Sequence, residues 1–166
     1  NIETKIVPSL VGYHLFDELK NKINNYENYK KKHPMSQVNI NDYKKLIKLF
    51  NPINFDAAKW VSTAKDAGMK YIVITSKHHD GLAMWPSDVN EWDIADATPF
   101  KRDPIAELAA ACKKAGIKFG VYYSQNLDWS NPGGGAMSGP RWDPGQEGDY
   151  DAYIKNVSAP QVDELI

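Results

Sequence analysis

The chain has 166 residues, 20 Lys and Arg against 21 Asp and Glu, 42% hydrophobic residues and 11% aromatic residues. A disordered tail or a polybasic segment would show a large net charge and few aromatic residues, so these numbers exclude both classes. The charges do not cluster and no stretch approaches the roughly 20 apolar residues of a membrane span, so we expect neither nucleic acid nor a membrane as a partner.

The N-terminal part of the chain, residues 1–50, is rich in Lys and Asn. We expect it to form a segment of helices and loops, with one helix over residues 42–50. A second unit, residues 51–166, is expected to hold the strands, and Asn54 or Asp56 is expected to start its first helix because Asn and Asp cap helix N-termini.

An internal repeat is the most informative feature of the remaining sequence. Residues 65–74 and 113–122 align position by position, 48 residues apart. Each copy is predicted to be a helix end, a glycine and then a strand. Gly68 and Gly116 fall where a helix favours a left-handed residue after its last turn.

The repeat predicts two helices and two strands. Apolar residues at helical spacing precede each glycine, and these are Trp60, Val61, Ala64 and Ala67 in the first copy and Ile105, Leu108, Ala109 and Cys112 in the second. The strands, residues 71–75 and 117–123, are apolar runs, which is typical of strands covered on both faces by helices. Strands that alternate with helices imply a parallel sheet, either doubly wound or closed into a (β/α)8 barrel.

Two long segments leave the carboxyl ends of the predicted strands, residues 76–101 and 124–148. Ligands bind at that edge in parallel α/β folds. Tryptophans lie in both segments, where they could stack on sugar rings or fix the loops to the body, and these are Trp85, Trp92, Trp129 and Trp142. Residues 149–166 are predicted to be helical, with an interruption at Pro160.

The sequence Lys77-His78-His79-Asp80-Gly81 follows the first strand directly and is the sharpest candidate for chemistry. Two imidazoles and a carboxylate supply donors, acceptors and near-neutral titration together. A metal site is one interpretation, although adjacent residues seldom reach one ion well. A loop whose His residues cap the backbone is a second. The position at the strand end favours a third, ligand binding.

Tyr122 and Tyr123 end the second strand at the corresponding edge. Alternation along a strand sends the two side chains to opposite faces, so one can line a site while the other packs under helices. Asp103 before Pro104 is predicted to start a helix. Cys112 lies on an apolar helix stripe and is expected to be a small buried hydrophobe.

Taken together, these motifs closely resemble the α-L-fucosidases of glycoside hydrolase family 29. The resemblance covers about residues 50–166 in order and with near-family spacing. Its strongest segments are Phe55-Asp56-Ala57, Lys77-His78-His79-Asp80-Gly81, and Lys118-Phe119-Gly120-Val121-Tyr122-Tyr123-Ser124 followed by Asp128-Trp129. It implies an α/β fold that is part of a (β/α)8 TIM-like barrel.

The same resemblance implies removal of terminal α-L-fucose from a fucosylated oligosaccharide or glycoconjugate by a retaining mechanism. His78, His79 and Tyr122 match family positions that line the fucose pocket, and Asp80 is expected to support the His pair from behind. No cofactor and no metal are implied. A periplasmic, secreted or lysosomal location follows from the family alone, and no oligomeric state is indicated.

The two carboxylates of a retaining glycosidase lie roughly 5 Å apart, and no residue of this sequence matches either of them in the family. We therefore assign no catalytic residue, and expect a Trp-x-Asp strand within about 15 residues after Ile166. A non-catalytic carbohydrate-binding relative and a metal-dependent hydrolase that uses the His-His-Asp cluster are the alternatives.

Overall fold

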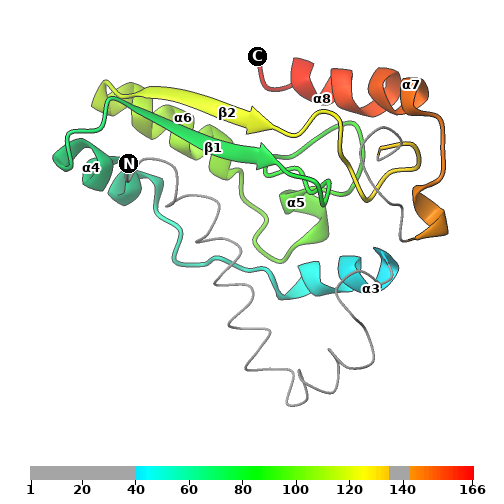
Figure 1. The fold of residues 1–166 in the computed structure, drawn as a ribbon. Helices are drawn as coiled ribbons and strands as arrows, with labels where there is room; N and C mark the ends of the chain where they lie inside the picture. Colours follow the sequence, from blue (N-terminus) through cyan, green and yellow to red (C-terminus); the bar gives the residue numbers. More distant parts are fainter. Residues whose placement is uncertain (1–39, 135–142) are drawn as a thin grey trace.

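The computed structural model describes residues 40–134 and 143–166 (Figure 1). The elements in chain order are α3 (Ile40–Lys45), the 3-10 turn η2 (Leu46–Leu49), α4 (Ala57–Asp66), β1 (Tyr71–Lys77), α5 (Ile94–Ala97), α6 (Pro104–Ala115), β2 (Lys118–Tyr123), the 3-10 turn η3 (Pro144–Gln146), α7 (Tyr150–Tyr153), the π-helical turn η4 (Ile154–Ser158) and α8 (Ala159–Asp163). None of the helices in these two ranges is long and apolar enough to cross a membrane.

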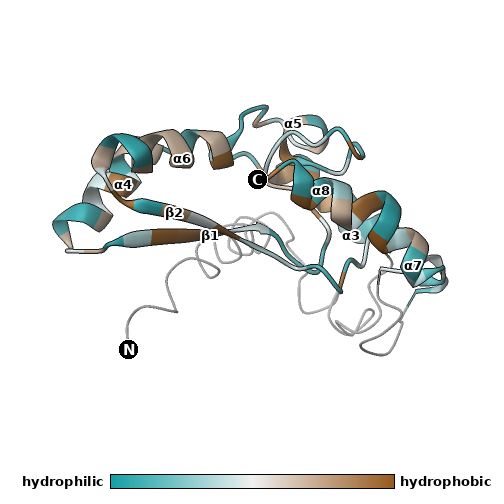
Figure 2. Ribbon diagram, turned by 90° about the horizontal axis from the view of Figure 1, so that it is seen from above, coloured by the Kyte–Doolittle hydropathy of each residue, from teal (hydrophilic) through white to brown (hydrophobic). Residues whose placement is uncertain are grey.

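The two strands pair in parallel, as the repeat predicts. The register joins Tyr71 to Lys118 at one end and Thr75 to Tyr122 near the other. Each strand follows a helix, α4 before β1 and α6 before β2, and these two helices lie on the same side of the strands (Figure 2). The described residues therefore contain two helix–strand units of an α/β fold.

The helix boundaries follow local signals in the sequence. The Asp56 carboxylate accepts a hydrogen bond from the Lys59 amide at 2.9 Å and caps α4. Asp103 caps α6 in the same way, with Pro104 at the first helical position. Gly116 ends α6 with a φ of 71°, a left-handed conformation that glycine adopts without strain. The expected helix starts and the expected glycine stop are confirmed.

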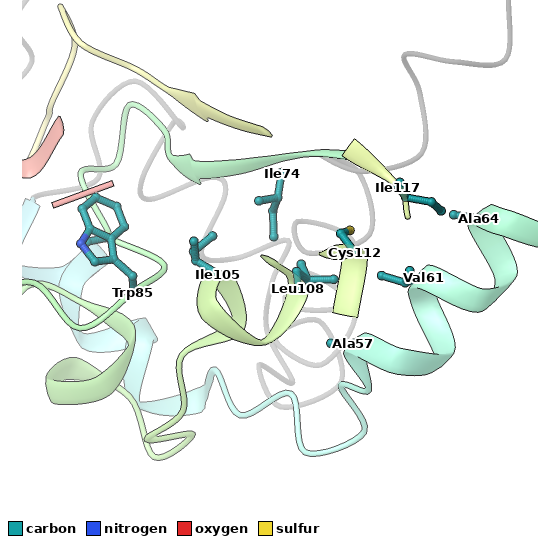
Figure 3. Close-up of a cluster of buried hydrophobic side chains, with 10 residues drawn as sticks. Ala57, Val61, Ala64, Ile74, Trp85, Ile105, Leu108, Cys112 and Ile117 are labelled. Atoms are coloured by element: carbon teal, nitrogen blue, oxygen red, sulfur yellow. The ribbon is translucent and has the colours of Figure 1, made fainter. Parts of the chain in front are cut away.

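The main hydrophobic core lies between α4, α6 and the sheet (Figure 3). It contains Ala57, Val61, Ala64, Ile74, Ala83, Trp85, Ile105, Leu108, Cys112 and Ile117. Cys112 is fully buried, as expected. Trp60 was expected on this apolar stripe but is 40% exposed, because Ala57, Val61 and Ala64 form the face of α4 that packs inward, and the Trp60 ring packs on Phe55 instead.

The opposite face of the sheet corrects one expectation. We expected helices on both faces of the strands, but within residues 40–134 and 143–166 the helices that flank the strands cover one face. On the other face Tyr71, Val73 and Tyr122 are 60%, 45% and 48% exposed. An apolar run shows that both faces of a strand carry apolar side chains, and it does not show what packs against them.

The C-terminal helical segment is interrupted as Pro160 predicts. Proline has no N–H to donate to the preceding turn, and the backbone widens there into the π-helical turn η4. The Ala159 N–H donates to the carbonyl of Ile154, five residues earlier. This segment packs back on the sheet side chains through Tyr153 and Gln161, both of which are buried.

Candidate functional site

The predicted site residues come together at the carboxyl edge of the sheet, where β1 and β2 end. The rings of His78 and His79 stack with their centroids 4.1 Å apart. The Tyr122 ring lies 6.0 Å from His78, at the end of the neighbouring strand. Parallel pairing explains this, because it brings the carboxyl ends of two strands to one edge although 43 positions separate His79 from Tyr122 in the chain.

The two tyrosines of β2 take opposite faces, as alternation predicts. Tyr122 lies on the exposed face of the sheet. Tyr123 lies on the helix-covered face, where its hydroxyl donates to Gln161 Oε1 at 2.8 Å and accepts from Lys77 Nζ at 3.0 Å. Tyr122 is therefore the tyrosine that faces the candidate site, and Tyr123 belongs to the support beneath it.

Trp129 is a further residue at this site. Its ring and the His79 ring meet edge to face, with centroids 5.6 Å apart and planes at 67°. Its backbone N–H donates to the His79 carbonyl at 2.7 Å. This tryptophan thus joins the loop after β2 to the loop after β1 and adds an aromatic surface beside the imidazoles.

The other loop tryptophans fix the loops to the body. Trp85 is buried in the core and its Nε1 donates to Glu164 Oε2 at 2.8 Å. Trp92 is half-buried and donates from Nε1 to the Asp80 carbonyl at 3.0 Å. Trp142 lies outside the described residues. The sequence left two functions open for the loop tryptophans, stacking on sugar rings and fixing the loops to the body. The contacts of Trp85 and Trp92 fit the second.

The Asp80 side chain is bonded to α3. Its Oδ2 accepts from the Tyr43 hydroxyl at 3.1 Å and its Oδ1 from the Leu82 amide at 3.3 Å. Burial raises the pKa of the Asp80 carboxyl, and burial with the Asp80 charge raises the pKa of the Tyr43 hydroxyl. These bonds hold the loop that carries His78 and His79 against the helix that precedes it.

The surroundings of His79 lower its pKa and so favour its neutral form. Burial lowers the pKa of His79, the neighbouring His78 lowers it further, and the Asp80 charge opposes them only in part. A neutral imidazole offers one N–H donor and one acceptor nitrogen. Together with the Tyr122 hydroxyl, the site presents the donors and acceptors that polyhydroxylated ligands need.

A buried ion pair beneath the site could not be recognised in the sequence. Lys77 Nζ lies 2.9 Å from Asp128 Oδ2, with the two side chains 0% and 1% exposed. Burial alone would lower the pKa of Lys77, but the Asp128 charge and the hydroxyls of Tyr123 and Tyr153 raise it above its ordinary range. The local sequence shows only a lysine at the end of a mostly apolar strand.

The three side chains of the His-His-Asp cluster are not placed together as the ligands of one metal ion. Across residues 40–134 and 143–166, no group of three or more His, Cys, Asp or Glu side chains is placed to hold an ion. The Asp80 carboxylate is occupied by Tyr43 and Leu82.

Comparison with known proteins identifies the family. A family model described as alpha-L-fucosidase matches residues 9–166. Alpha-L-fucosidase 1 of Arabidopsis thaliana is 41% identical over 78 residues, which are 46% of this chain and 15% of that protein. The tissue alpha-L-fucosidase of Homo sapiens is 40% identical over 79 residues, 47% of this chain and 16% of that protein. The chain thus spans less than a fifth of the length of these relatives.

Solved structures agree with the sequence comparisons. The alpha-L-fucosidase AlfC of Lactobacillus casei, in complex with its alpha-L-fucose product, is 46% identical with a TM-score of 0.68, covering 75% of this chain and 43% of that one. The enzyme of Vibrio sp. strain EJY3 is 42% identical with a TM-score of 0.74, covering 79% and 22%. With a family model over nearly the whole sequence, this chain belongs to the alpha-L-fucosidase family.

Proposed function

We propose that the protein containing these residues hydrolyses terminal α-L-fucose from glycans, and that His78, His79 and Tyr122 bind the fucose. The observation that carries the proposal is the meeting of these three side chains at the carboxyl edge of one parallel sheet, with ring centroids 4.1 and 6.0 Å apart. Family membership supports the reaction, since the relatives matched are α-L-fucosidases.

The chemistry of the three side chains suits a sugar. A sugar hydroxyl both donates and accepts a hydrogen bond, and a neutral imidazole and a phenol do the same. Trp129 adds an apolar edge beside His79, and aromatic rings pack on the apolar faces of sugars. The site therefore offers polar and apolar contacts on neighbouring surfaces, which is what recognition of a deoxy sugar requires.

We propose that the two helix–strand units belong to a (β/α)8 barrel. Support comes from the exposed sheet face, where the side chains of Tyr71, Val73 and Tyr122 would line the interior of a closed barrel. On this proposal residues 51–166 contribute barrel units, and residues 1–50 form a segment of the same catalytic domain.

None of the described carboxylates near the site is proposed as a catalytic group. Retaining hydrolysis needs two carboxyl groups roughly 5 Å apart that both reach the glycosidic bond. Asp80 is held by Tyr43 and Leu82, and Asp128 is buried in its ion pair with Lys77. We propose that the nucleophile and the acid/base come from parts of the protein outside the described residues.

The proposed substrate is a fucosylated oligosaccharide or glycoconjugate. AlfC, one of the similar structures, has been solved in complex with Fuca(1,6)GlcNAc. Because such glycans are found mainly outside the cytosol, we propose a secreted, periplasmic or lysosomal location. This location rests on the family and on the substrate.

The test uses the full-length protein and an aryl α-L-fucoside. Tyr122→Phe removes one hydroxyl from the site, and Tyr71→Phe is the matched control at the opposite end of the same sheet face. We expect turnover by the wild type and a KM raised about tenfold in Tyr122→Phe, the loss of roughly 1.4 kcal/mol of one hydrogen bond. Tyr71→Phe should match the wild type.

Two results would overturn the proposal. Fucose binding without turnover by the full-length protein would identify a non-catalytic carbohydrate-binding relative. Turnover with equal KM values in all three proteins would remove Tyr122 from the site.

A further inference from the structure

We propose that the buried pair Lys77–Asp128 is a positioning device that holds Trp129 against His79 and thereby shapes the fucose pocket. The inference rests on the proposed function for its effect on catalysis. Neither side chain of the pair reaches the exposed surface, so both act through the residues that they hold.

Lys77 is completely enclosed by polar partners. Its Nζ lies 3.0 Å from the hydroxyl of Tyr123, 3.0 Å from the hydroxyl of Tyr153 and 2.9 Å from Asp128 Oδ2. The two hydroxyls keep other acceptors, because Tyr123 donates to Gln161 and Tyr153 donates to the Gln125 carbonyl at 3.0 Å. Asp128 is the one of these three partners whose charge compensates that of Lys77.

Asp128 in turn organises the loop after β2. Its Oδ1 accepts from the Ser130 amide at 2.9 Å and from the Ser130 hydroxyl at 2.6 Å. Its Oδ2 accepts from Asn131 Nδ2 at 3.0 Å, and its backbone N–H donates to the Gly134 carbonyl. Both carboxylate oxygens thus act on residues that follow Trp129 in the chain.

Trp129 connects the loop that Asp128 organises to the His79 side of the pocket. It is the next residue after Asp128, its backbone N–H donates to the His79 carbonyl at 2.7 Å, and its ring meets the His79 ring. A shift of the Asp128 side chain would move the Trp129 backbone and weaken both contacts. His79 would then lose the surface that sets its orientation.

Gly81 shows independently how closely the two loops fit. Its φ is +78°, and a Cβ built there would lie 2.2 Å from Asp128 Oδ1 and 2.3 Å from Ser130 Oγ. The turn that follows His78 and His79 therefore closes directly over the Asp128 carboxylate, with no room for a methyl group. The pair and the two loops form one packed unit.

Stability alone is a poor explanation for a buried ion pair. Replacing such a pair with apolar residues of similar size is often neutral or stabilising, because the charges no longer have to be desolvated. A pair kept for stability can be exchanged in this way without loss of function. A pair that positions Trp129 cannot, because an apolar residue at Asp128 gives Ser130 and Asn131 nothing to donate to.

The experiment compares three variants of the full-length protein, K77M/D128L, Asp128→Asn and Leu108→Ala, with the wild type. The double variant K77M/D128L replaces the pair by apolar side chains, and Leu108→Ala is a control that weakens the core away from the loops. The readouts are the melting temperature, KM and kcat for an aryl α-L-fucoside, and hydrogen exchange at the Trp129 amide.

We expect K77M/D128L to melt within a few degrees of the wild type, with Trp129 exchange at least about tenfold faster and KM raised about ten- to a hundredfold. Leu108→Ala should lower the melting temperature and leave KM and the relative exchange at Trp129 unchanged. Asp128→Asn, which keeps the shape of the side chain, should reproduce the changes in exchange and KM.

The proposal would be overturned if both Asp128 variants kept the KM and the Trp129 exchange rate of the wild type. It would also be overturned if the double variant did not fold, since the pair would then be needed for folding. The exchange measurement needs no turnover. An inactive wild type would therefore contradict the proposed function. The exchange rate of the Trp129 amide would still show whether the Lys77–Asp128 pair positions Trp129.

Discussion

The imidazoles of His78 and His79 stack with centroids 4.1 Å apart and planes inclined by 24°, although the residues are neighbours in the chain. Side chains of adjacent residues in a strand point to opposite faces, so this pairing requires the chain to leave the strand at Lys77. Two protonated rings at this separation would repel each other. The arrangement therefore disfavours protonation of His79, whose pKa the neighbouring His78 helps to lower.

The first prediction concerns the protonation of His79. Burial and then His78 lower its pKa below the ordinary 6.5. An NMR titration of the full-length protein should show a His79 midpoint below 6.5, and His78→Gln should raise it only partway because burial is the larger cause. A midpoint at or above 6.5 in the wild type would contradict the structure.

The lowered pKa of His79 also makes the stability of the fold depend on pH. Below pH 6.5 the unfolded chain binds a proton at His79 that the folded chain binds less readily. The contribution of His79 to the free energy of unfolding is therefore complete above pH 6.5. It is lost as the pH falls from 6.5 toward the lower pKa of the folded state. Melting temperatures between pH 7 and 5 should fall less steeply in His79→Gln than in the wild type.

The second prediction compares two glycines with the same backbone conformation. Gly81 and Gly68 have φ values of +78° and +79°, but a Cβ at Gly81 would collide with Asp128 while one at Gly68 would meet nothing within 4 Å. Gly68→Ala should cost about 1 kcal/mol of stability and Gly81→Ala about 3 kcal/mol. Urea unfolding measures both, and equal losses would refute the close packing of the two loops.

The third prediction concerns the bond between Tyr43 and Asp80. Tyr43→Phe leaves the half-buried Asp80 with one fewer donor and should cost about 2 kcal/mol. Its matched control is Tyr150→Phe, which removes an exposed bond to Asn126 and should change stability by less than about 0.5 kcal/mol. If the two variants unfold at the same urea concentration, the contact between α3 and the histidine loop does not contribute to stability.

The fourth prediction concerns the single cysteine. Cys112 is fully buried in the core, and burial raises the pKa of its thiol. Iodoacetamide should therefore modify native protein far more slowly than protein unfolded in urea, since the thiolate is the reactive form. Mass spectrometry follows the adduct, and equal rates in the two states would show that the core around Cys112 opens readily.

Local signals in the sequence were sufficient for the two helix–strand units. The capping residues Asp56 and Asp103 and the glycine that ends α6 act on their immediate neighbours, so their effects can be predicted from a short window. The repeat could not fix the register. It aligns Tyr71 with Phe119, whereas the sheet pairs Tyr71 with Lys118, because packing decides how strands align.

The site was predictable only in part. The motifs located His78, His79 and Tyr122 at the ends of strands, and parallel pairing brought them together. The buried state of Lys77 depends on Asp128, which lies 51 positions further along the chain. No local pattern reveals such a pair, because a lysine is buried only when a distant partner compensates its charge.

A crystal structure of the full-length protein with α-L-fucose bound would test the proposed fucose site. We predict fucose hydroxyls within hydrogen-bond distance of the His78 and His79 imidazoles and of the Tyr122 hydroxyl, with Trp129 beside the sugar. Fucose bound at a site that contains none of His78, His79 and Tyr122 would contradict the proposal.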